Sequence, residues 1–121
     1  MQESGENYLE TILILSERNG TVRSIDIANE LGYTKPSVSR AVKLLVERGM
    51  LTMAQGGELQ LTAGGLAAAG AIYERHKRIS RFFVELLSVE KDVADRDACR
   101  IEHVISEESF EKIKEYVNSK F

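Results

Sequence analysis

The sequence predicts a mainly α-helical protein with an N-terminal winged helix-turn-helix, a two-stranded wing and a helical C-terminal domain. Apolar residues recur at helical spacing over most of the chain, and strand-like alternation is confined to one short stretch. The 121 residues contain a single proline, which also favours helices. A chain of this length forms one domain, or a small domain with an appendage.

The first predicted helix covers residues 4–18 and packs behind the two helices that follow. Leu9, Ile12 and Leu13 line one of its faces, and Gly20 ends it. Its early turns also carry Asn7 and Glu10. Taken alone, an acidic side chain near a helix start is a favourable partner for the helix dipole and nothing more.

Residues 24–49 predict two short helices joined by a tight corner. In the first helix, Ile25, Ala28 and Leu31 recur at three-residue steps and form an apolar stripe. Gly32 ends this helix, because glycine adopts the left-handed conformation at little cost.

The second helix of this pair has its own start signal and its own apolar face. Thr34 caps it and Pro36 fits its first turn, where no backbone donor is needed. The apolar face follows helical spacing through Val38, Ala41, Val42 and Leu45. The spacing of residues 28, 32 and 38 is similar to the helix-turn-helix of DNA-binding proteins. The other interpretation is an ordinary helical hairpin with a solvated polar face.

Charge is distributed unevenly along the chain. The formal net charge is −3, which argues against a generally basic nucleic-acid binder. Residues 33–48, however, contain four basic residues and only one acidic residue. The polar face of the second helix carries Lys35, Ser37, Ser39, Arg40 and Lys43. A basic helix face on an acidic body suits local contact with phosphates.

Two short strands are predicted next, over residues 50–54 and 58–62, around a Gly-Gly turn. A hairpin directly after a recognition helix is the wing of a winged-helix domain. Its tip has no lysine or arginine, so we expect weak DNA contacts from it.

The C-terminal half predicts a long helix over 63–87 capped by Thr62, a fifth helix over 92–106 and a sixth over 107–120 capped by Ser106. The glycines near the start of the long helix weaken it, so we expect close packing to compensate. These helices are too few to bury their apolar residues alone, so we expect residues 71–121 to form half of a homodimer interface. The alternative is that they fold back on the winged helix. The apolar residues concerned are Ile72, Ile79, Phe82, Phe83, Leu86, Phe110, Ile113 and Val117.

Cys99, Glu102 and His103 stand at positions i, i+3 and i+4 of the fifth helix, so they project from one face. A thiolate, a carboxylate and an imidazole form a plausible partial shell for a divalent transition metal. The spacing alone also allows a cysteine that fills the core and a core histidine with satisfied hydrogen bonds.

The order of winged helix, long helix and Ala98-Cys99-Arg100-Ile101-Glu102-His103-Val104 resembles the diphtheria toxin repressor and manganese transport regulator family. The resemblance covers nearly the whole chain and points to the short, two-domain type. It implies a metal-activated transcriptional repressor of iron or manganese homeostasis genes, which binds double-stranded operator DNA as a homodimer. It also implies a DNA-binding domain over 1–70 and a metal-binding and dimerisation domain over 71–121.

The resemblance implies the site residues position by position. The implied metal ligands are Asn7, Glu10, His76, Cys99, Glu102 and His103. Asn7 departs from the family, which has methionine or aspartate there, and offers one carbonyl oxygen. Ser80 and Asp95 stand where the iron branch has a second-site glutamate and histidine, so that second site is in question.

The resemblance also places Thr34, Pro36 and Arg40 against base edges. The full set of candidate DNA-binding residues is Thr34, Lys35, Pro36, Ser37, Ser39, Arg40 and Lys43. Because a thiolate shifts a site toward softer ions, we favour Fe(II) as the activating metal, with Mn(II) as runner-up.

Several classes are disfavoured by the sequence. No stretch is long and apolar enough to span a membrane, and no signal-peptide pattern opens the chain. One cysteine cannot form an internal disulfide, so we expect a cytoplasmic protein. We expect neither an enzyme nor a small-molecule substrate, because no oxyanion device accompanies the Cys-Glu-His group. The competing function is a metal-independent winged-helix regulator with Cys99 as a redox switch.

Overall fold

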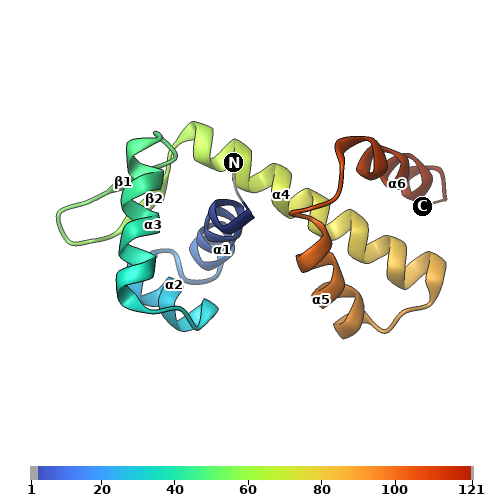
Figure 1. Cartoon of the computed structure of the whole chain (residues 1–121), viewed down its shortest axis with the longest axis horizontal. Coiled ribbons are helices and arrows are strands. Elements are labelled where there is room, and N and C mark those ends of the chain that lie inside the picture. Colours follow the sequence, from blue (N-terminus) through green and yellow to red (C-terminus); the bar gives the residue numbers. More distant parts are fainter. Residues whose placement is uncertain (1–2, 121) are drawn as a thin grey trace. The chain divides into compact units, whose positions relative to one another are not determined.

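The computed structural model describes residues 3–120, with side chains from residue 5 onward. It consists of six α-helices, one π-helical turn and one two-stranded antiparallel sheet (Figure 1). The predicted mainly helical fold class is confirmed. The chain divides into two compact units, Met1–Gly70 and Ala71–Phe121, and the division falls inside one continuous helix, α4 (Ala63–Arg81).

The N-terminal unit is built on α1 (Glu3–Asn19), α2 (Ser24–Leu31) and α3 (Lys35–Glu47), which all contact one another. Its core contains large apolar side chains from each helix, from the sheet and from the segment before α2: Leu9, Ile12, Val22, Ile27, Val38, Val42, Leu45, Leu51 and Leu59. The predicted first helix, ending at Gly20 in a left-handed conformation, is therefore confirmed to within a residue.

The corner between α2 and α3 follows the predicted local chemistry. Gly32 ends α2 with a φ of 70°, and the Thr34 side chain accepts a hydrogen bond from the backbone N–H of Ser37 at 3.3 Å. Pro36 lies in the first turn of α3. One part of the prediction is wrong. Ile25 is exposed and Ile27 is fully buried, so the apolar stripe of α2 runs through Ile27 and Ala28.

The wing is a hairpin of β1 (Leu51–Met53) and β2 (Leu59–Leu61), paired Leu51 to Leu61, Thr52 to Gln60 and Met53 to Leu59. The predicted hairpin is confirmed, but each strand is shorter than expected. Beyond the last pair, the backbone N–H of Ala54 donates to the Glu58 carbonyl at the base of the loop. An isolated bridge from Val22 also joins Leu59, so the segment before α2 runs beside the wing.

Helix α4 begins with the predicted cap, because the Thr62 hydroxyl accepts from the backbone N–H of Gly65 at 3.0 Å. A Cβ at Gly65 would lie 2.0 Å from the Met50 carbonyl oxygen, which explains why this position is glycine. At Gly64 the nearest atom would be Thr62 Oγ1 at 3.8 Å, so close packing does not explain that glycine. The last turn of the predicted long helix is π-helical, η1 (Phe82–Leu86).

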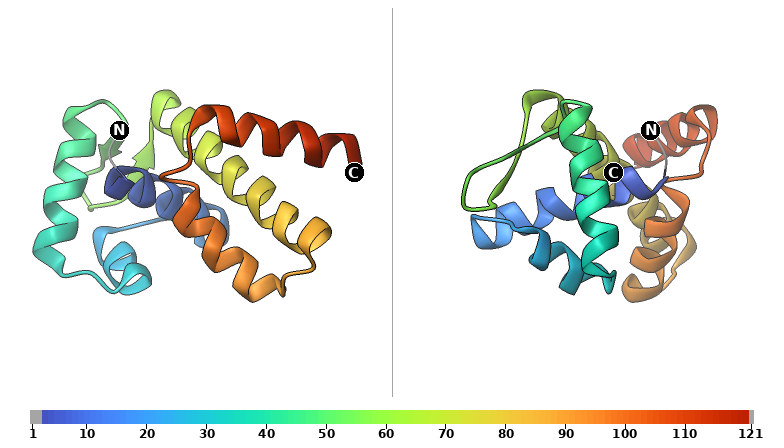
Figure 2. Two further views of the ribbon diagram at one scale, coloured as in Figure 1. Left: turned by 45° about the vertical axis from the view of Figure 1, so that its right-hand side comes forward. Right: turned by 60° about the vertical axis from the view of Figure 1, so that its left-hand side comes forward.

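In the C-terminal unit, α5 (Lys91–Ile101) and α6 (Glu107–Lys120) lie beside the second half of α4 (Figure 2). The predicted sixth helix is confirmed, with Ser106 Oγ accepting from the Ser109 N–H at 3.1 Å. The predicted end of the fifth helix is wrong. The chain leaves α5 at Ile101, and the Val104 N–H bonds to the Ile101 carbonyl in a tighter turn. Because α5 ends before residue 106, the Ser106 side chain can cap α6.

The C-terminal unit has a small core of its own, formed by Ile79, Ala98 and Phe110 from three different helices. The expectation that these helices are too few to bury their apolar residues is therefore wrong in part. Phe82 and Ile113 are only half-buried, and other apolar side chains are exposed: Leu87, Val104 and Tyr116.

Candidate metal centre and nucleic-acid interface

Three predicted ligands gather where α5 ends. Cys99 lies in the last turn of α5, and Glu102 and His103 lie in the turn that follows. One ligand atom from each lies within 4.8 Å of the others. Cys99 is exposed, whereas the side chain of Glu102 is fully buried and that of His103 is 4% exposed. The premature end of α5 therefore still leaves a thiol, a carboxylate and an imidazole together.

The Glu102 carboxylate is the centre of this group. Its Oε2 lies 2.9 Å from His76 Nδ1, and its Oε1 lies 3.3 Å from His103 Nε2. Within the described residues, Oε1 has no hydrogen bond. A buried carboxylate is costly unless it is compensated by a cation. The donor set of sulfur, oxygen and nitrogen, around a carboxylate with free acceptor capacity, therefore fits a divalent transition metal.

A second polar group adjoins His76 on its other side. His76 Nε2 lies 4.0 Å from Asp95 Oδ1, and the buried Ser80 hydroxyl donates to the same oxygen at 2.5 Å. The Ser80 hydrogen bond is the main reason that the pKa of Asp95 is lowered, and Lys91, 3.2 Å away, adds to it. Ser80 and Asp95, the two second-site positions that differ from the iron branch of the family, thus contact each other. Asp95 also faces His76, a candidate ligand.

Arg75 braces the turn that carries Glu102, a role that the sequence analysis did not predict. Its guanidinium donates to the Glu102 backbone carbonyl at 3.3 Å and to Glu107 at 2.8 Å. It also lies over the Phe110 ring, 5.2 Å from the centroid. One arginine of α4 therefore holds the start of α6 and the turn before it. No sequence signal could reveal this contact, because one partner is a main-chain oxygen.

The other two candidate ligands, Asn7 and Glu10, lie one turn apart on α1 in the N-terminal unit. Glu10 is buried and Asn7 is half-buried. The Asn7 amide nitrogen donates to the Tyr33 hydroxyl at 3.5 Å, and Tyr8 packs edge-on against the Tyr33 ring at 5.8 Å. Burial raises the pKa of Tyr8. Helix α1 is thus in contact with the residue that precedes the cap of α3.

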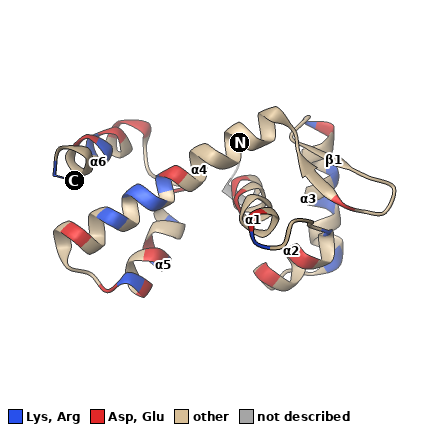
Figure 3. Cartoon of the chain, turned by 180° about the vertical axis from the view of Figure 1, so that it is seen from behind, with Lys and Arg blue, Asp and Glu red and all other residues tan. Residues whose placement is uncertain are grey.

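The candidate DNA-binding residues share the outer surface of α3. Most are exposed, and Ser37 is half-buried by its part in the Thr34 cap; the exposed ones are Thr34, Lys35, Pro36, Ser39, Arg40 and Lys43. Figure 3 shows Lys and Arg along α3, whereas the wing has neither. The helix-turn-helix therefore displays its basic side chains on the face that the sequence predicted.

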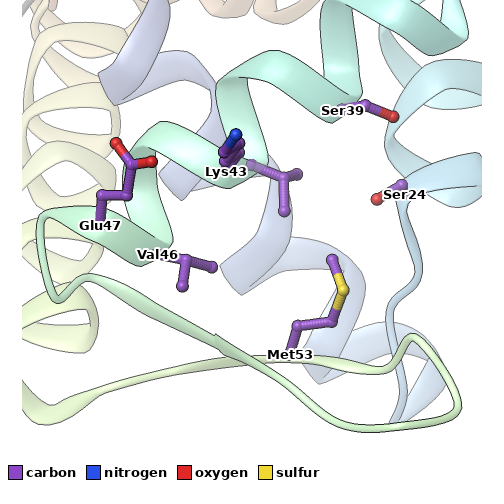
Figure 4. A pocket seen from close by; sticks show the side chains of 7 residues that line it. Ser24, Ser39, Lys43, Val46, Glu47 and Met53 are labelled. Atoms are coloured by element: carbon purple, nitrogen blue, oxygen red, sulfur yellow. The ribbon is translucent and has the colours of Figure 1, made fainter.

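A shallow groove of about 380 Å³ runs between α3, the start of α2 and the wing (Figure 4). Ser39 and Lys43 of α3 line it, with Ser24 on α2 across from them. Its other lining residues are Val42, Val46, Glu47 and Met53. Two candidate DNA-binding residues therefore border a groove with a largely apolar floor.

In a comparison with known proteins, each half of the chain matches a protein family. Residues 1–57 match the family described as iron dependent repressor, N-terminal DNA binding domain. Residues 62–119 match the family described as iron dependent repressor, metal binding and dimerisation domain.

Individual relatives agree. A helix-turn-helix-type transcriptional regulator of Methanocaldococcus jannaschii is 32% identical over 94% of this chain and 92% of its own. The iron-dependent repressor IdeR of Mycobacterium tuberculosis is 32% identical over 97% of this chain, which spans 51% of that protein. The solved structure of a manganese-dependent transcriptional repressor in complex with manganese superimposes with a TM-score of 0.87 at 25% identity, covering 94% of this chain and 52% of that one. Among the described residues, no helix is both long and apolar enough to cross a membrane.

Proposed function

The chain belongs to the family of iron- and manganese-dependent transcriptional repressors, and from this premise we propose that it is a metal-activated repressor of genes for metal-ion homeostasis. The domain roles follow the two units. Residues 1–70 bind double-stranded operator DNA, and residues 71–121 bind metal and form the homodimer. The protein acts in the cytoplasm and takes no small-molecule substrate.

The observation that carries the proposal is the group of Cys99, Glu102 and His103 around a buried carboxylate. These three side chains hold the metal, with His76 beside Glu102. A bound divalent cation supplies positive charge that offsets the burial of the Glu102 carboxylate. Glu10 and the Asn7 carbonyl oxygen complete the shell from α1. Asn7 suits this role because its amide nitrogen is engaged by Tyr33, which leaves its oxygen as the available end.

Activation is a population shift. Ligands from the two units meet in only one arrangement of the domains, and that arrangement is the one that binds the operator. Metal and DNA therefore strengthen each other's binding by the same factor. The contact from Asn7 to Tyr33 supports a route to the recognition helix, because Tyr33 directly precedes the Thr34 cap.

The metal we favour is Fe(II), with Mn(II) as runner-up, because the thiolate of Cys99 softens an otherwise hard donor set. One relative is named an iron-dependent repressor and one structural neighbour a manganese-dependent repressor. In vitro affinity alone does not decide, since Zn, Ni and Co ions bind such donors at least as well.

The homodimer is supported by apolar surface on the C-terminal unit. Phe82 and Tyr116 pack edge-on against each other with Tyr116 still 48% exposed, and Leu87 and Val104 are more exposed still. A second copy of the chain covers these side chains, and two recognition helices then meet two half-sites of one operator. Sedimentation that shows a monomer at micromolar concentration, with and without metal, would refute this dimer.

The test is a DNA-binding titration of the metal-free protein with Fe(II), Mn(II) and Zn(II) under anaerobic conditions. We expect saturable, stoichiometric metal binding that raises DNA affinity. Cys99→Ala should lose activation by Fe(II) and keep its fold, whereas Arg100→Ala, on the exposed neighbouring position of α5, should behave like the parent. If Cys99→Ala responds to Fe(II) as the parent does, the metal assignment at Cys99 is wrong.

The exposure of Cys99 favours one second candidate, a metal-independent regulator in which this thiol is a redox switch. The same titration separates the two functions. A redox switch predicts full DNA binding without metal, and loss of that binding with a mild oxidant in the parent but not in Cys99→Ala.

A further inference from the structure

The wing of this protein carries no cation of its own. Residues 51–61 contain neither lysine nor arginine, and their only charged residue is Glu58. A winged-helix domain whose wing is acidic is expected to make weak contacts with a phosphate backbone. The fold changes this expectation, because an arginine from another segment is placed on the wing.

That arginine is Arg23, the residue immediately before α2. Its guanidinium donates to the Gly56 carbonyl in the loop of the wing and, through Nη2, to Glu58 Oε1 at 2.5 Å. A Cβ at Gly57 would meet Arg23 Nη1 at 3.5 Å, so the guanidinium lies directly over the tip. The backbone explains this placement, since the Leu59 N–H donates to the Val22 carbonyl at 2.7 Å and ties the two segments together.

The guanidinium of Arg23 has N–H groups that these contacts do not use. A guanidinium carries five N–H groups, and the contacts with Gly56 and Glu58 occupy two of them. Its side chain is 52% exposed. An exposed ion pair of this kind contributes little to the stability of the fold. Arg23 is therefore held in one orientation by the wing, while three of its five N–H groups are not used by these two contacts.

The position of Arg23 is continuous with the surface already assigned to DNA. Ser24, its immediate neighbour in the chain, lines the groove that Ser39 and Lys43 border on the other side. Met53 of the wing lines the same groove, so the wing and the residue that follows Arg23 both border the surface that carries Ser39 and Lys43 of α3.

From these contacts we propose that Arg23 is the phosphate-contacting residue of the wing and that Glu58 orients it. The ligand is the sugar-phosphate backbone of duplex DNA, contacted through the guanidinium N–H groups that Gly56 and Glu58 leave available. The proposal rests on the DNA-binding function proposed above and adds a residue outside the helix-turn-helix to it.

The test measures how DNA affinity depends on salt. The probe is a duplex selected from a random-sequence library by the parent protein in the presence of Mn(II). Removing one phosphate contact in Arg23→Ala should flatten the plot of log affinity against log salt by about 0.9 per protomer. Arg18→Ala is the matched control, because Arg18 is an equally exposed arginine of the same unit paired with Glu30 at 3.7 Å. It should leave the slope unchanged.

Two further variants separate a phosphate contact from a simple brace of the wing. Arg23→Lys keeps the charge and should keep the slope. Glu58→Gln keeps an acceptor for Arg23 and removes a negative charge, so it should bind at least as tightly as the parent. If Arg23→Ala and Glu58→Gln both weaken binding with unchanged slopes, Arg23 only braces the wing and the proposal is overturned. If the parent protein selects no duplex with Fe(II), Mn(II) or Zn(II), the proposed function fails instead.

Discussion

The two units of this chain differ in what they bury. The N-terminal unit buries apolar side chains from three helices and the wing, and the basic residues of α3 lie on its surface. The C-terminal unit has a much smaller apolar core and buries Glu102 and Ser80, with His103 nearly enclosed. The N-terminal unit is organised around an apolar core, whereas the C-terminal unit is organised around buried polar side chains.

This difference shows where each unit obtains its stability. Burial of apolar side chains stabilises a fold without a bound ligand, so the N-terminal unit is expected to be stable with or without metal. Buried polar groups are costly unless they are compensated, so the C-terminal unit is expected to depend on its ligand. In the N-terminal unit the buried polar residues Glu10 and Thr11 both lie on α1, the helix that carries the proposed additional ligands.

The largest expected effect comes from removing the buried carboxylate. Glu102→Gln should lower metal affinity at least about 100-fold, because a lost ligand should matter at least as much as a lost outer contact. It should also abolish the rise in melting temperature that metal gives. The metal-free variant should be no less stable than the parent, since a neutral amide replaces an incompletely compensated charge.

Calorimetry with and without Mn(II) measures both quantities. Glu111→Gln is the control, because Glu111 is an exposed carboxylate on α6 and is not a member of the Glu102 group. A metal-dependent melting shift of parental size in Glu102→Gln would remove the distinction between the units.

The next effect is in the N-terminal unit and has nothing to do with metal. Gly65→Ala places a Cβ 2.0 Å from the Met50 carbonyl oxygen, so α4 or the start of the wing must move. We expect a loss of about 3 kcal/mol in the free energy of unfolding, from overpacking against backbone. Gly64→Ala, where the nearest atom is 3.8 Å away, should be neutral or stabilising by up to about 1 kcal/mol. Chemical denaturation of both metal-free variants gives these values, and equal stabilities would contradict the packing argument.

The same contrast explains how far the sequence could predict this molecule. The helix-turn-helix was predictable because its signals are local: Gly32 is left-handed, Thr34 caps α3, and Pro36 lies in the first turn. The predicted apolar stripe through Ile25 was wrong, because apolar residues at three-residue steps are compatible with more than one buried face of an eight-residue helix. Only tertiary packing selects Ile27 as the buried residue.

In the C-terminal unit local signals were less informative. The fifth helix was expected to continue to residue 106, because nothing between Ile101 and Ser106 is a strong helix breaker. The candidate ligands were identified by resemblance to a family, and their spacing was ambiguous by itself. Arg23 and Arg75 were missed because each binds a main-chain carbonyl, and a sequence carries no signal for such a partner.

A moderate effect is expected at the surface of α3. Arg40 is exposed on the recognition helix, and an arginine there can bind a guanine with two hydrogen bonds. Arg40→Ala should cost about 1 to 3 kcal/mol of operator affinity and relax specificity at one base pair. Lys35→Ala and Lys43→Ala should weaken binding to all sequences alike and reduce the salt dependence. Competition binding with single-base variants of the selected duplex distinguishes these outcomes, and parental affinity in Arg40→Ala would contradict the orientation of α3.

The smallest effect concerns the polar group beside His76. The Ser80 hydroxyl lowers the pKa of Asp95 below its usual value of 3.8, so this contact stabilises the fold above that pH. The stabilisation is lost as pH falls through the lowered pKa, because protonated Asp95 no longer attracts the donor in the same way. Ser80→Ala should therefore be less stable than the parent at neutral pH, and the difference should shrink below about pH 4. The Asp95 side chain is 38% exposed, so the difference should stay below about 1 kcal/mol.

Carbon-detected NMR titration of the metal-free protein measures the pKa of Asp95 directly. It should rise in Ser80→Ala, because the Ser80 hydrogen bond is the largest single cause that lowers it. An unchanged pKa in Ser80→Ala would mean that the buried hydroxyl does not set the charge of Asp95, and that the C-terminal unit is less preorganised around its polar groups than its contacts indicate.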